Sequence, residues 1–313
     1  MHNKVLVITG TTASGKTAAA VELALRFNGE IISADSMQVY KLMDIGTAKP
    51  TVSERKGVPH YMMDIIMPDE IFTLADYLDG AKIAVKDILS RGKLPIIVGG
   101  TGLYISSFIK NIDLCETETD TGYREYLRNF TGEELMQMLK KVDPERADKI
   151  HHNDVKRLSR ALELYRLTGL TAEEQEKKSK EKKSPFEFLS FCLTCQDRDA
   201  LYDRINFRVD EMIISGLEKE VRSLYEKGYL DTGLTAAQAI GYKEFLPYFR
   251  KEKGLEEVIA AIKQESRRYA KRQLTWFRKE PFFEWVYINS LDKKNFENLL
   301  NFLVKRVEFF INI

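Results

Sequence analysis

Short apolar runs alternate with longer amphipathic segments along most of the 313-residue chain. Runs rich in β-branched and aromatic residues predict five strands, at Lys4–Thr9, Glu30–Ala34, Leu94–Val98, Phe186–Leu193 and Phe283–Ile288. Segments with helical periodicity predict helices at Ala18–Phe27, Thr73–Arg91, Arg198–Ser215 and Asp292–Phe310. Because strands and helices alternate, the predicted fold is α/β, a parallel sheet flanked by helices.

The composition becomes more polar between residues 112 and 185. Short polar helices are expected there, at Glu133–Val142, Pro144–His151 and Asp154–Thr168. The apolar strand pattern resumes directly afterwards, which indicates an inserted all-helical subdomain. We therefore expect an α/β core domain made of residues 1–111 and 186–313, with a helical subdomain of residues 112–185 inserted into it.

A glycine-rich loop follows the first predicted strand and fits the phosphate-loop pattern G-x-x-x-x-G-K-[ST]. Its residues are Gly10, Thr11, Thr12, Ala13, Ser14, Gly15, Lys16 and Thr17. Backbone N–H groups of such a loop surround a chain of phosphates, and the N-terminus of the following helix adds partial positive charge. Lys16 would reach the terminal phosphates, and the Thr17 hydroxyl would ligate Mg²⁺. The sequence thus predicts a P-loop fold that binds a diphosphate or a triphosphate.

Whole-chain composition excludes several classes of protein. The formal net charge is only +1, so any basic binding surface must be local. No apolar run has membrane-spanning length, and a first strand at residue 4 leaves no room for a signal peptide. Three cysteines (Cys115, Cys192 and Cys195) favour a reducing compartment over a disulfide framework. We expect a cytoplasmic protein without a membrane partner, and we interpret the Cys192–Cys195 C-x-x-C as strand residues because no second pair has zinc spacing.

In a parallel sheet of this kind, the carboxyl ends of the strands form the ligand crevice. Asp35 follows the second strand, and its carboxylate could accept a proton, hold Mg²⁺ through water, or only cap the next turn. The third strand ends in Gly99, Gly100 and Thr101, where ATP-hydrolysing P-loop proteins usually carry an Asp. This favours a reaction that needs no activated water, although a tight turn also explains the glycines. Lys49, in a loop punctuated by Gly and Pro, is another candidate to face the crevice.

Two basic groups lie on predicted helices. Arg204 and Arg208 share one helical face, and Arg208 could contact phosphate if that helix flanks the crevice. Lys156, Arg157 and Arg160 form a second group, which could meet a polyanion or only be a solvated face.

The strongest basic stretch is residues 266–279, which carries six basic residues and no acid. Arg268, Lys271 and Arg272 share a helical face, and Tyr269, Trp276 and Phe277 supply aromatic rings. Positive charge interleaved with aromatic rings suits phosphate contacts and base stacking. A basic amphipathic surface helix is the alternative.

Several stretches, in their order along the chain, resemble the bacterial tRNA dimethylallyltransferases, also called tRNA isopentenyltransferases. They are residues 10–17, 35–40, 44–50, 98–104, 151–163, 240–243 and 270–278. Separate matches in the correct order are far more specific than one phosphate loop. The family usually has Pro where Thr11 stands, and a Pro at that position only stiffens the loop.

The resemblance implies transfer of a dimethylallyl group from dimethylallyl diphosphate to the exocyclic N6 amine of the adenosine immediately 3′ of the anticodon in tRNA. Residues 10–17 would hold the diphosphate of the donor, with Mg²⁺ at Thr17. Lys16, Thr101 and Arg208 would stabilise the charge that gathers on the leaving diphosphate. Asp35 would orient the adenine amine and accept its proton.

The resemblance also implies that tRNA is held by residues from both parts of the chain. In the α/β core these are Asp35, Ser36, Met37, Gln38, Thr101, Gln238, Ala239, Ile240, Gly241, Tyr242, Lys243, Lys271, Arg272, Gln273, Leu274, Thr275, Trp276, Phe277 and Arg278. In the helical insertion, which would grip the anticodon stem-loop, they are Tyr123, Lys156, Arg157, Leu158, Ser159 and Arg160. We expect the protein to act as a monomer.

Two other classes of protein share parts of this pattern. A P-loop kinase has the same loop and fold, but it leaves the basic stretch and the inserted helices unexplained. An RNA-binding switch protein that uses ATP or GTP explains the basic stretch, but it requires the missing acid at the end of the third strand. The choice between dimethylallyl diphosphate and ATP as the donor distinguishes these alternatives.

Overall fold

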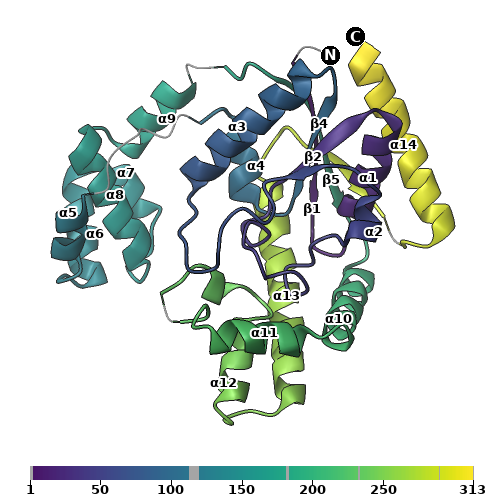
Figure 1. Cartoon of the computed structure of the whole chain (residues 1–313). Helices are drawn as coiled ribbons and strands as arrows, with labels where there is room; N and C mark the ends of the chain where they lie inside the picture. Colours follow the sequence, from purple (N-terminus) through teal and green to yellow (C-terminus); the bar gives the residue numbers. More distant parts are fainter. Residues whose placement is uncertain (1–2, 113–119, 181–182, 232, 289, 313) are drawn as a thin grey trace. The chain divides into compact units, whose positions relative to one another are not determined.

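The computed structural model describes residues 3–112, 120–180, 183–231, 233–288 and 290–312 (Figure 1). The chain divides into two compact units, of which the first joins Met1–Ile109 to Pro185–Ile313 and the second is Lys110–Ser184. The predicted helical subdomain, residues 112–185, begins two residues later than the second unit and ends one residue later. Cys115 lies outside the described residues.

Every strand of the first unit runs parallel to its neighbours, in the order β3-β2-β4-β1-β5-β6. The strands are β1 (Lys4–Gly10), β2 (Gly29–Ser33), β3 (His60–Tyr61), β4 (Leu94–Gly99), β5 (Glu187–Thr194) and β6 (Glu284–Tyr287). β1 lies between β4 and β5 and is buried along its whole length, as expected for a parallel sheet covered on both faces. The five predicted strands and the α/β class are confirmed. The additional β3 has two residues, too few to produce an apolar pattern.

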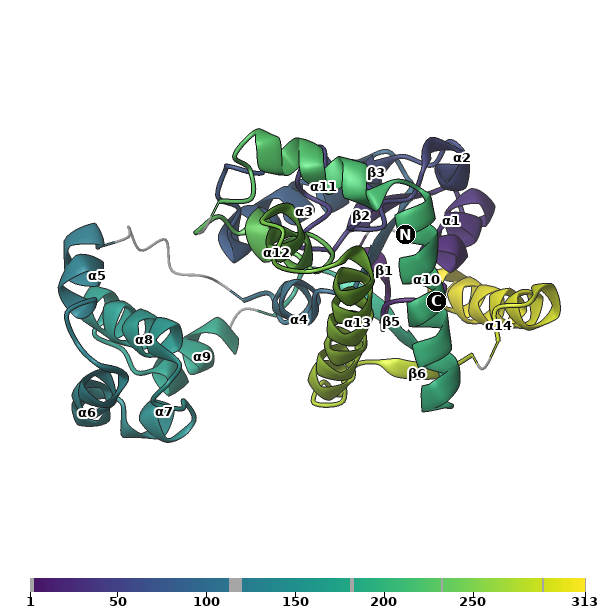
Figure 2. The ribbon, with the colours of Figure 1, turned by 90° about the horizontal axis from the view of Figure 1, so that it is seen from below.

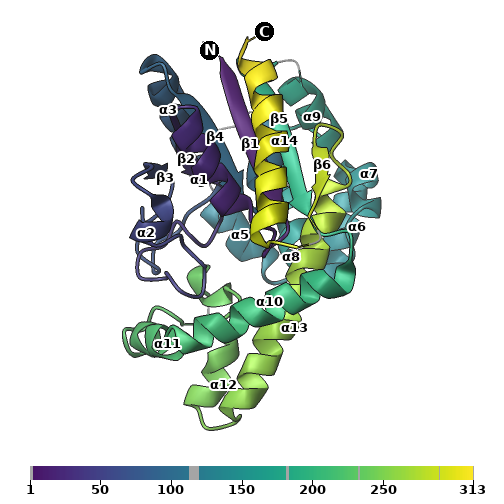
Figure 3. The same ribbon diagram turned by 90° about the vertical axis from the view of Figure 1, so that its right-hand side faces the viewer.

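Helices cover both faces of this sheet. α1 (Lys16–Arg26) and α14 (Lys293–Asn312) pack on the face that carries Leu6, and Figure 3 shows the two helices side by side. α3 (Leu74–Ser90) and α4 (Gly102–Ile109) lie against the opposite face. The hydrophobic core of the first unit therefore sits on either side of the central strands.

A further group of helices lies at the carboxyl end of the strands (Figures 2 and 3). It contains α10 (Arg198–Ile214), α11 (Leu217–Glu226), α12 (Leu246–Phe249), α13 (Leu255–Phe277) and the 3-10 turns η1 (Ala236–Gln238) and η2 (Lys243–Phe245). Their shared core includes Val39, Tyr40 and Met43, which follow β2. The short α2 (Val52–Arg55) belongs to the same connection between β2 and β3. This packing places α10 and α13 next to the strand ends, where ligands of open α/β sheets bind.

In its described residues, the second unit contains helices and no strand. Its helices are α5 (Thr121–Leu127), α6 (Gly132–Val142), α7 (Pro144–Asp148), α8 (Val155–Thr168) and α9 (Ala172–Lys180). Leucines that face inward form its core, among them Leu127, Leu135, Leu139, Leu158 and Leu162.

Two of the helices predicted in this unit, now α6 and α8, are confirmed, but the third prediction was too long. α7 ends at Asp148 and not at residue 151, because Ile150 turns into the core and the Asp154 N–H bonds to the His151 carbonyl at 2.8 Å. Capping boxes define the starts of other helices. In α3 and α6, Thr73 and Thr131 each pair reciprocally with the acid three residues later.

Candidate active site

The first part of the phosphate loop is held by β5 and α13. Gly10 has a φ of 141°, and a Cβ atom there would lie 1.9 Å from the carbonyl oxygen of Leu193, so only glycine fits. The Thr11 N–H donates to that same carbonyl at 3.2 Å. The Thr12 N–H donates to Oε1 of Gln273 at 2.9 Å. These two N–H groups are therefore not available to a phosphate.

The second part of the loop presents free backbone donors. Within the described part of the chain, no acceptor pairs with the N–H groups of Ala13, Ser14, Gly15, Lys16 and Thr17. Left-handed φ values of 60° at Ala13 and 80° at Gly15 turn successive N–H groups inward, and the first turn of α1 adds its unpaired donors. The eight predicted phosphate-binding residues thus separate into a scaffold, residues 10–12, and a cradle for anions, residues 13–17.

Two cations lie beside this cradle. Lys16 Nζ donates to the Thr11 carbonyl at 3.2 Å, and Arg208 Nη1, from α10, donates to Oγ1 of Thr12 at 3.3 Å. Burial first, and then repulsion by Arg208, lower the pKa of Lys16 to about 8, against the attraction of Asp35. Burial also lowers the pKa of Arg208, while Asp35 and Glu54 oppose this shift. A multiply charged anion between the two cations would relieve their repulsion, so the geometry favours a diphosphate ligand.

Asp35 and Thr101 lie at the ends of neighbouring strands β2 and β4. Asp35 Oδ1 accepts the Met37 N–H at 2.9 Å, so the carboxylate caps the next turn. No described residue hydrogen-bonds to its Oδ2, and the carboxylate acts electrostatically on both Lys16 and Arg208. Thr101 Oγ1 accepts the Ser36 N–H at 3.0 Å, which joins the two strand ends. One carboxylate oxygen thus remains open to a ligand beside the phosphate cradle.

The two glycines before Thr101 allow close packing of the protein on itself. A Cβ atom on Gly99 would lie 2.1 Å from the Ala34 carbonyl oxygen, and one on Gly100 would lie 2.3 Å from Nε2 of Gln273. Among the two interpretations of this stretch, the structure supports a tight turn, because protein groups and not an open space face both glycines. The absence of an acid at this strand end remains a feature of the sequence itself.

Lys49 does not face the crevice, so that prediction was wrong. Its side chain is buried, and Nζ donates to the Tyr40 carbonyl at 2.5 Å, to Asp44 Oδ1 at 2.8 Å and to Asp64 Oδ1 at 2.5 Å. The side chain of Gln38 also forms its hydrogen bonds within the protein. Its Oε1 accepts from Ser33 Oγ at 2.9 Å, and its Nε2 donates to the carbonyls of residues 47 and 48.

The helix α13 presents two different faces. Tyr269, Gln273 and Trp276 lie along one face and contact the segment after β4. Tyr269 and Gln273 donate to the Gly100 carbonyl at 3.4 and 3.0 Å, and Trp276 Nε1 donates to Ser106 Oγ at 3.0 Å. The other face is exposed and carries Arg268, Lys271, Arg272 and Thr275, with Arg278 at its end. Arg267, the remaining arginine, contacts Asn206 on α10 at 2.5 Å.

Some residues predicted to contact tRNA have buried side chains. These are Leu158, Ala239, Tyr242, Gln273 and Phe277. Leu158 belongs to the leucine core of the second unit, and Phe277 packs edge-on against Phe283. None of these five side chains is exposed enough to contact tRNA directly. Of the others, Gln238 is exposed, whereas Met37, Ile240, Lys243 and Leu274 are partly buried.

In the helical unit, the predicted basic residues are exposed and differ in their partners. Arg157 contacts Asp154 at 3.3 Å, and Lys156 is exposed. Arg160 Nη1 contacts Glu163 Oε2 at 2.7 Å, and Arg124 Nε contacts the other oxygen of that buried carboxylate at 2.9 Å. Sequence reasoning missed Arg124 and Glu163.

Tyr123 and Ser159 complete the predicted set in the helical unit, and both are partly buried. The guanidinium of Arg166 lies 4.4 Å from the centre of the Tyr123 ring. Arg166 also contacts Asp120, the N-cap of α5, at 3.2 Å. The position of the Tyr123 ring therefore depends on residues from both α5 and α8.

Glu220 on α11 is a further residue that sequence reasoning missed. Its carboxylate accepts the N–H groups of Asp44, Ile45 and Gly46 at 3.0, 2.8 and 3.1 Å, and also the Tyr242 hydroxyl at 2.6 Å. A Cβ atom on Gly46 would lie 2.4 Å from the Tyr242 ring. The loop after β2 is thus anchored from α11, through contacts between residues about 175 positions apart that no local pattern reveals.

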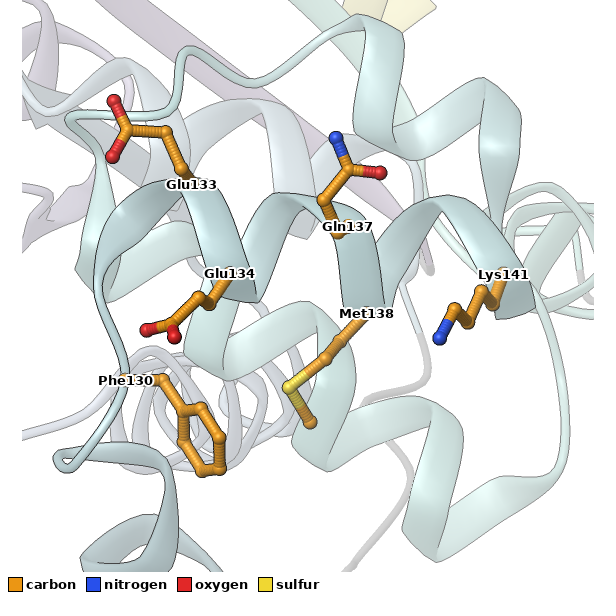
Figure 4. A pocket seen from close by; sticks show the side chains of 6 residues that line it. All are labelled: Phe130, Glu133, Glu134, Gln137, Met138 and Lys141. Carbon is orange, nitrogen blue, oxygen red and sulfur yellow. The ribbon is translucent and has the colours of Figure 1, made fainter.

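Other candidate sites are weaker. A hollow of about 320 Å³ on α6 is lined by Phe130, Glu133, Glu134, Gln137, Met138 and Lys141 (Figure 4). Glu134 is already engaged in the capping box of its helix. Cys192 is buried in β5, whereas Cys195 lies just beyond that strand, against the prediction.

Among the described residues, no three His, Cys, Asp or Glu are placed to hold a metal ion. None of the helices described here has the length and hydropathy needed to cross a bilayer.

The parallel sheet, the cradle of loop N–H groups and the Lys16–Arg208 pair define a P-loop type of α/β protein built to hold a phosphate chain. The family model for IPP transferase matches residues 38–280. Among curated relatives, the tRNA dimethylallyltransferase of Thermoanaerobacter sp. (strain X514) is 48% identical over 97% of this chain and 98% of its own. The one from Halalkalibacterium halodurans is 45% identical over 98% and 99%. The chain belongs to the IPP transferase family, which confirms the family predicted from the motifs.

Solved structures agree with this assignment. The tRNA isopentenylpyrophosphate transferase from Bacillus halodurans has a TM-score of 0.71 and 43% identity, covering 98% of this chain and 97% of that one. A eukaryotic dimethylallyltransferase acting on tRNA has a TM-score of 0.84 and 31% identity, covering 99% of this chain and 80% of that one.

Proposed function

We propose that this protein transfers a dimethylallyl group from dimethylallyl diphosphate to the exocyclic N6 amine of the adenosine immediately 3′ of the anticodon in tRNA. The products are N6-dimethylallyladenosine and diphosphate. The observation that carries the proposal is the partly buried Lys16–Arg208 pair beside five free loop N–H groups, with an open oxygen of Asp35 at the adjacent strand end. The names of the close relatives support the same reaction.

The cradle binds and activates the leaving group. As the bond between the allylic carbon and the diphosphate oxygen breaks, its electron pair remains on the diphosphate. Lys16, Arg208 and the N–H groups of residues 13–17 stabilise this charge. Thr101, which joins β4 to the segment after β2, contributes its hydroxyl at the same edge.

Asp35 acts on the other reactant. The lone pair of the adenine N6 attacks the allylic carbon, and a C–N bond forms as the C–O bond breaks. The amine then loses a proton, which the open Oδ2 of Asp35 accepts. Because Oδ1 is held by the Met37 N–H at 2.9 Å, the carboxylate is oriented before the adenine arrives.

Mg²⁺ fits this site as an ion that arrives with the diphosphate. Thr17 stands in the first turn of α1 with a partly exposed side chain, and Asp35 is the neighbouring carboxylate. Mg²⁺ commonly binds through one or two protein oxygens, water and substrate phosphates, so a dedicated cluster of acids is not required. When bound, it would neutralise part of the charge on the leaving diphosphate.

The tRNA is bound by basic surfaces of both units. In the first unit these are the exposed face of α13 with Lys271, Arg272 and Arg278, together with the exposed Gln238. In the helical unit they are Lys156, Arg157 and Arg160, which we assign to the anticodon stem-loop. We also propose that the protein acts as a monomer in the cytoplasm.

The proposal is tested by offering the purified protein unmodified tRNA and Mg²⁺ with either dimethylallyl diphosphate or ATP. We expect mass spectrometry of the nucleosides to show one added dimethylallyl group on adenosine, only with the prenyl donor. If ATP is consumed and no prenylated nucleoside forms, the phosphate loop serves a kinase and the proposal is wrong.

A further inference from the structure

Gln273 differs from its neighbours on α13. Its side chain is only 5% exposed, whereas Lys271, Arg272 and Thr275 are exposed. Both ends of its amide are used inside the protein: Oε1 accepts the Thr12 N–H at 2.9 Å, and Nε2 donates to the Gly100 carbonyl at 3.0 Å. Gln273 lies within a basic stretch that the sequence predicts to bind RNA, yet its side chain points away from solvent and toward the phosphate loop.

Gln273 bonds to two separate parts of the donor site, the phosphate loop and the segment that follows β4. Thr12 is in the phosphate loop, and its hydroxyl accepts from Arg208 at 3.3 Å. Gly100 precedes Thr101, whose hydroxyl bonds to the Ser36 N–H at 3.0 Å. One buried amide thus fixes the spacing between the loop and the end of β4. The fit is tight, since a Cβ atom on Gly100 would lie 2.3 Å from Nε2.

α13 is a single helix, so its two faces cannot be ordered independently. Its exposed face carries the cations that the proposed function assigns to tRNA, and Gln273 on the inner face holds the loop that the proposed function assigns to the donor. A ligand that orders the shared element lowers the cost of ordering it for the second ligand, and the effect is reciprocal.

We propose that Gln273 is a positioning residue that couples tRNA binding on α13 to binding of the diphosphate donor at the phosphate loop. This inference rests on the proposed function. Without the amide, α13 still presents its basic face and the loop still has its N–H groups, but neither site senses the other. Removing Gln273 should therefore abolish the coupling and leave binding of RNA alone unchanged.

The test measures donor affinity with and without RNA. The donor is the inert analogue dimethylallyl thiolodiphosphate, the RNA is an anticodon stem-loop, and isothermal titration calorimetry gives the dissociation constants with Mg²⁺ present. For the unaltered protein we expect RNA to tighten donor binding by about fivefold or more. The coupling ratio is the donor dissociation constant without RNA divided by the one with RNA. For Gln273→Met, which keeps the volume and loses both hydrogen bonds, we expect a coupling ratio near one. Its affinity for RNA alone should be unchanged.

Gln264→Met is the matched control, because Gln264 is an exposed glutamine on the same helix. It should keep the full ratio. If Gln273→Met keeps that ratio and only lowers the melting temperature, Gln273 is a scaffold residue and the inference is wrong. It is equally wrong if the unaltered protein binds donor and RNA independently.

A second variant covers the case in which Gln273→Met does not fold. In Gly100→Ala, the added methyl group would displace Nε2 of Gln273 from the Gly100 carbonyl, so this variant should also reduce the ratio. An unchanged ratio would contradict the inference. In combination with Gln273→Ala, it should reduce the ratio no further than either change alone. Product formation by the unaltered protein, measured in parallel, separates failure of this inference from failure of the proposed function.

Discussion

Positive charge occurs in two different settings in this protein. At the phosphate loop, Lys16 and Arg208 contact a carbonyl and a hydroxyl, and none of the ion pairs among the described residues involves either cation. In the helical unit, Arg124 and Arg160 both contact the buried carboxylate of Glu163, at 2.9 and 2.7 Å. The difference shows what each setting is suited to bind.

Cations that are partly buried without an acid are held at an energetic disadvantage that an arriving anion removes. Such a site selects a small ligand of high charge density. Cations that are exposed and paired keep most of their hydration, and they contribute weak, salt-dependent contacts spread over a large polyanion. Changes at the loop should therefore alter chemistry, and changes at the surfaces should alter RNA binding.

The largest effect is expected for Asp35→Asn. Turnover should fall by about 10²–10⁴-fold, because the variant loses the group that accepts the amine proton. Donor binding should not weaken, because the variant removes a negative charge that lies near the site of the negatively charged diphosphate. Single-turnover rates and donor dissociation constants check this, with Asp69→Asn, an exposed acid, as the control. Near-normal turnover would exclude Asp35 as the base.

Charge reversal on α13 should act on RNA binding. Changing Arg268, Lys271 and Arg272 together to Glu removes about three phosphate contacts, so the slope of log K against log salt should fall by about two. If the binding lines of the two proteins meet near 1 M salt, a slope difference of two corresponds to about a 400-fold loss of affinity at 50 mM salt. Filter binding across a salt series measures both quantities.

The matched control for this triple reversal changes three exposed lysines of α14, Lys293, Lys294 and Lys305, to Glu. It makes the same change in net charge on another helix. Equal losses in the two variants would mean that only total charge matters, and no loss in the first would assign the α13 face to structure alone.

Donor binding should depend on pH through Lys16, whose pKa is about 8 in the free protein. The ammonium form attracts the diphosphate, and this form is lost as pH rises through about 8. The dissociation constant should therefore increase from pH 7 to 9, by about tenfold at most, with proton uptake on binding above pH 8. Titration calorimetry in buffers of different ionisation enthalpy measures both. Lys16→Ala should bind more weakly and without this pH dependence, and a pH-dependent Lys16→Ala would assign the effect to another group.

The smallest effect is expected for Glu163→Gln. Arg124 and Arg160 lose their common anchor, so the protein should be less stable by about 1–2 kcal/mol, and RNA binding should weaken only a few-fold. Thermal unfolding and stem-loop binding check these values. Asp154→Asn, which removes the charge opposite exposed Arg157 and keeps a good N-cap, should change stability by less than about 1 kcal/mol. Equal destabilisation by both variants would remove the distinction between buried and exposed pairs.

Much of this molecule is specified by local patterns. The strands, the phosphate loop and the helical insertion are visible in the sequence because apolar periodicity and glycine spacing are properties of neighbouring residues. The family could also be predicted, since its motifs occur in order along the chain. Residues 10–17 and Asp35 were found this way, and the structure places them at one edge of the sheet.

Tertiary structure alone decided which side chains are free to act. Helical periodicity shows that residues share a face, but not which other element covers that face. Lys49 was expected at the crevice but is buried beside Asp44 and Asp64. Gln273 was expected to contact tRNA, but its amide reaches a loop 261 residues away. The cause is physical: burial and pairing depend on contacts between distant segments, which form only when the sheet and its helices have packed.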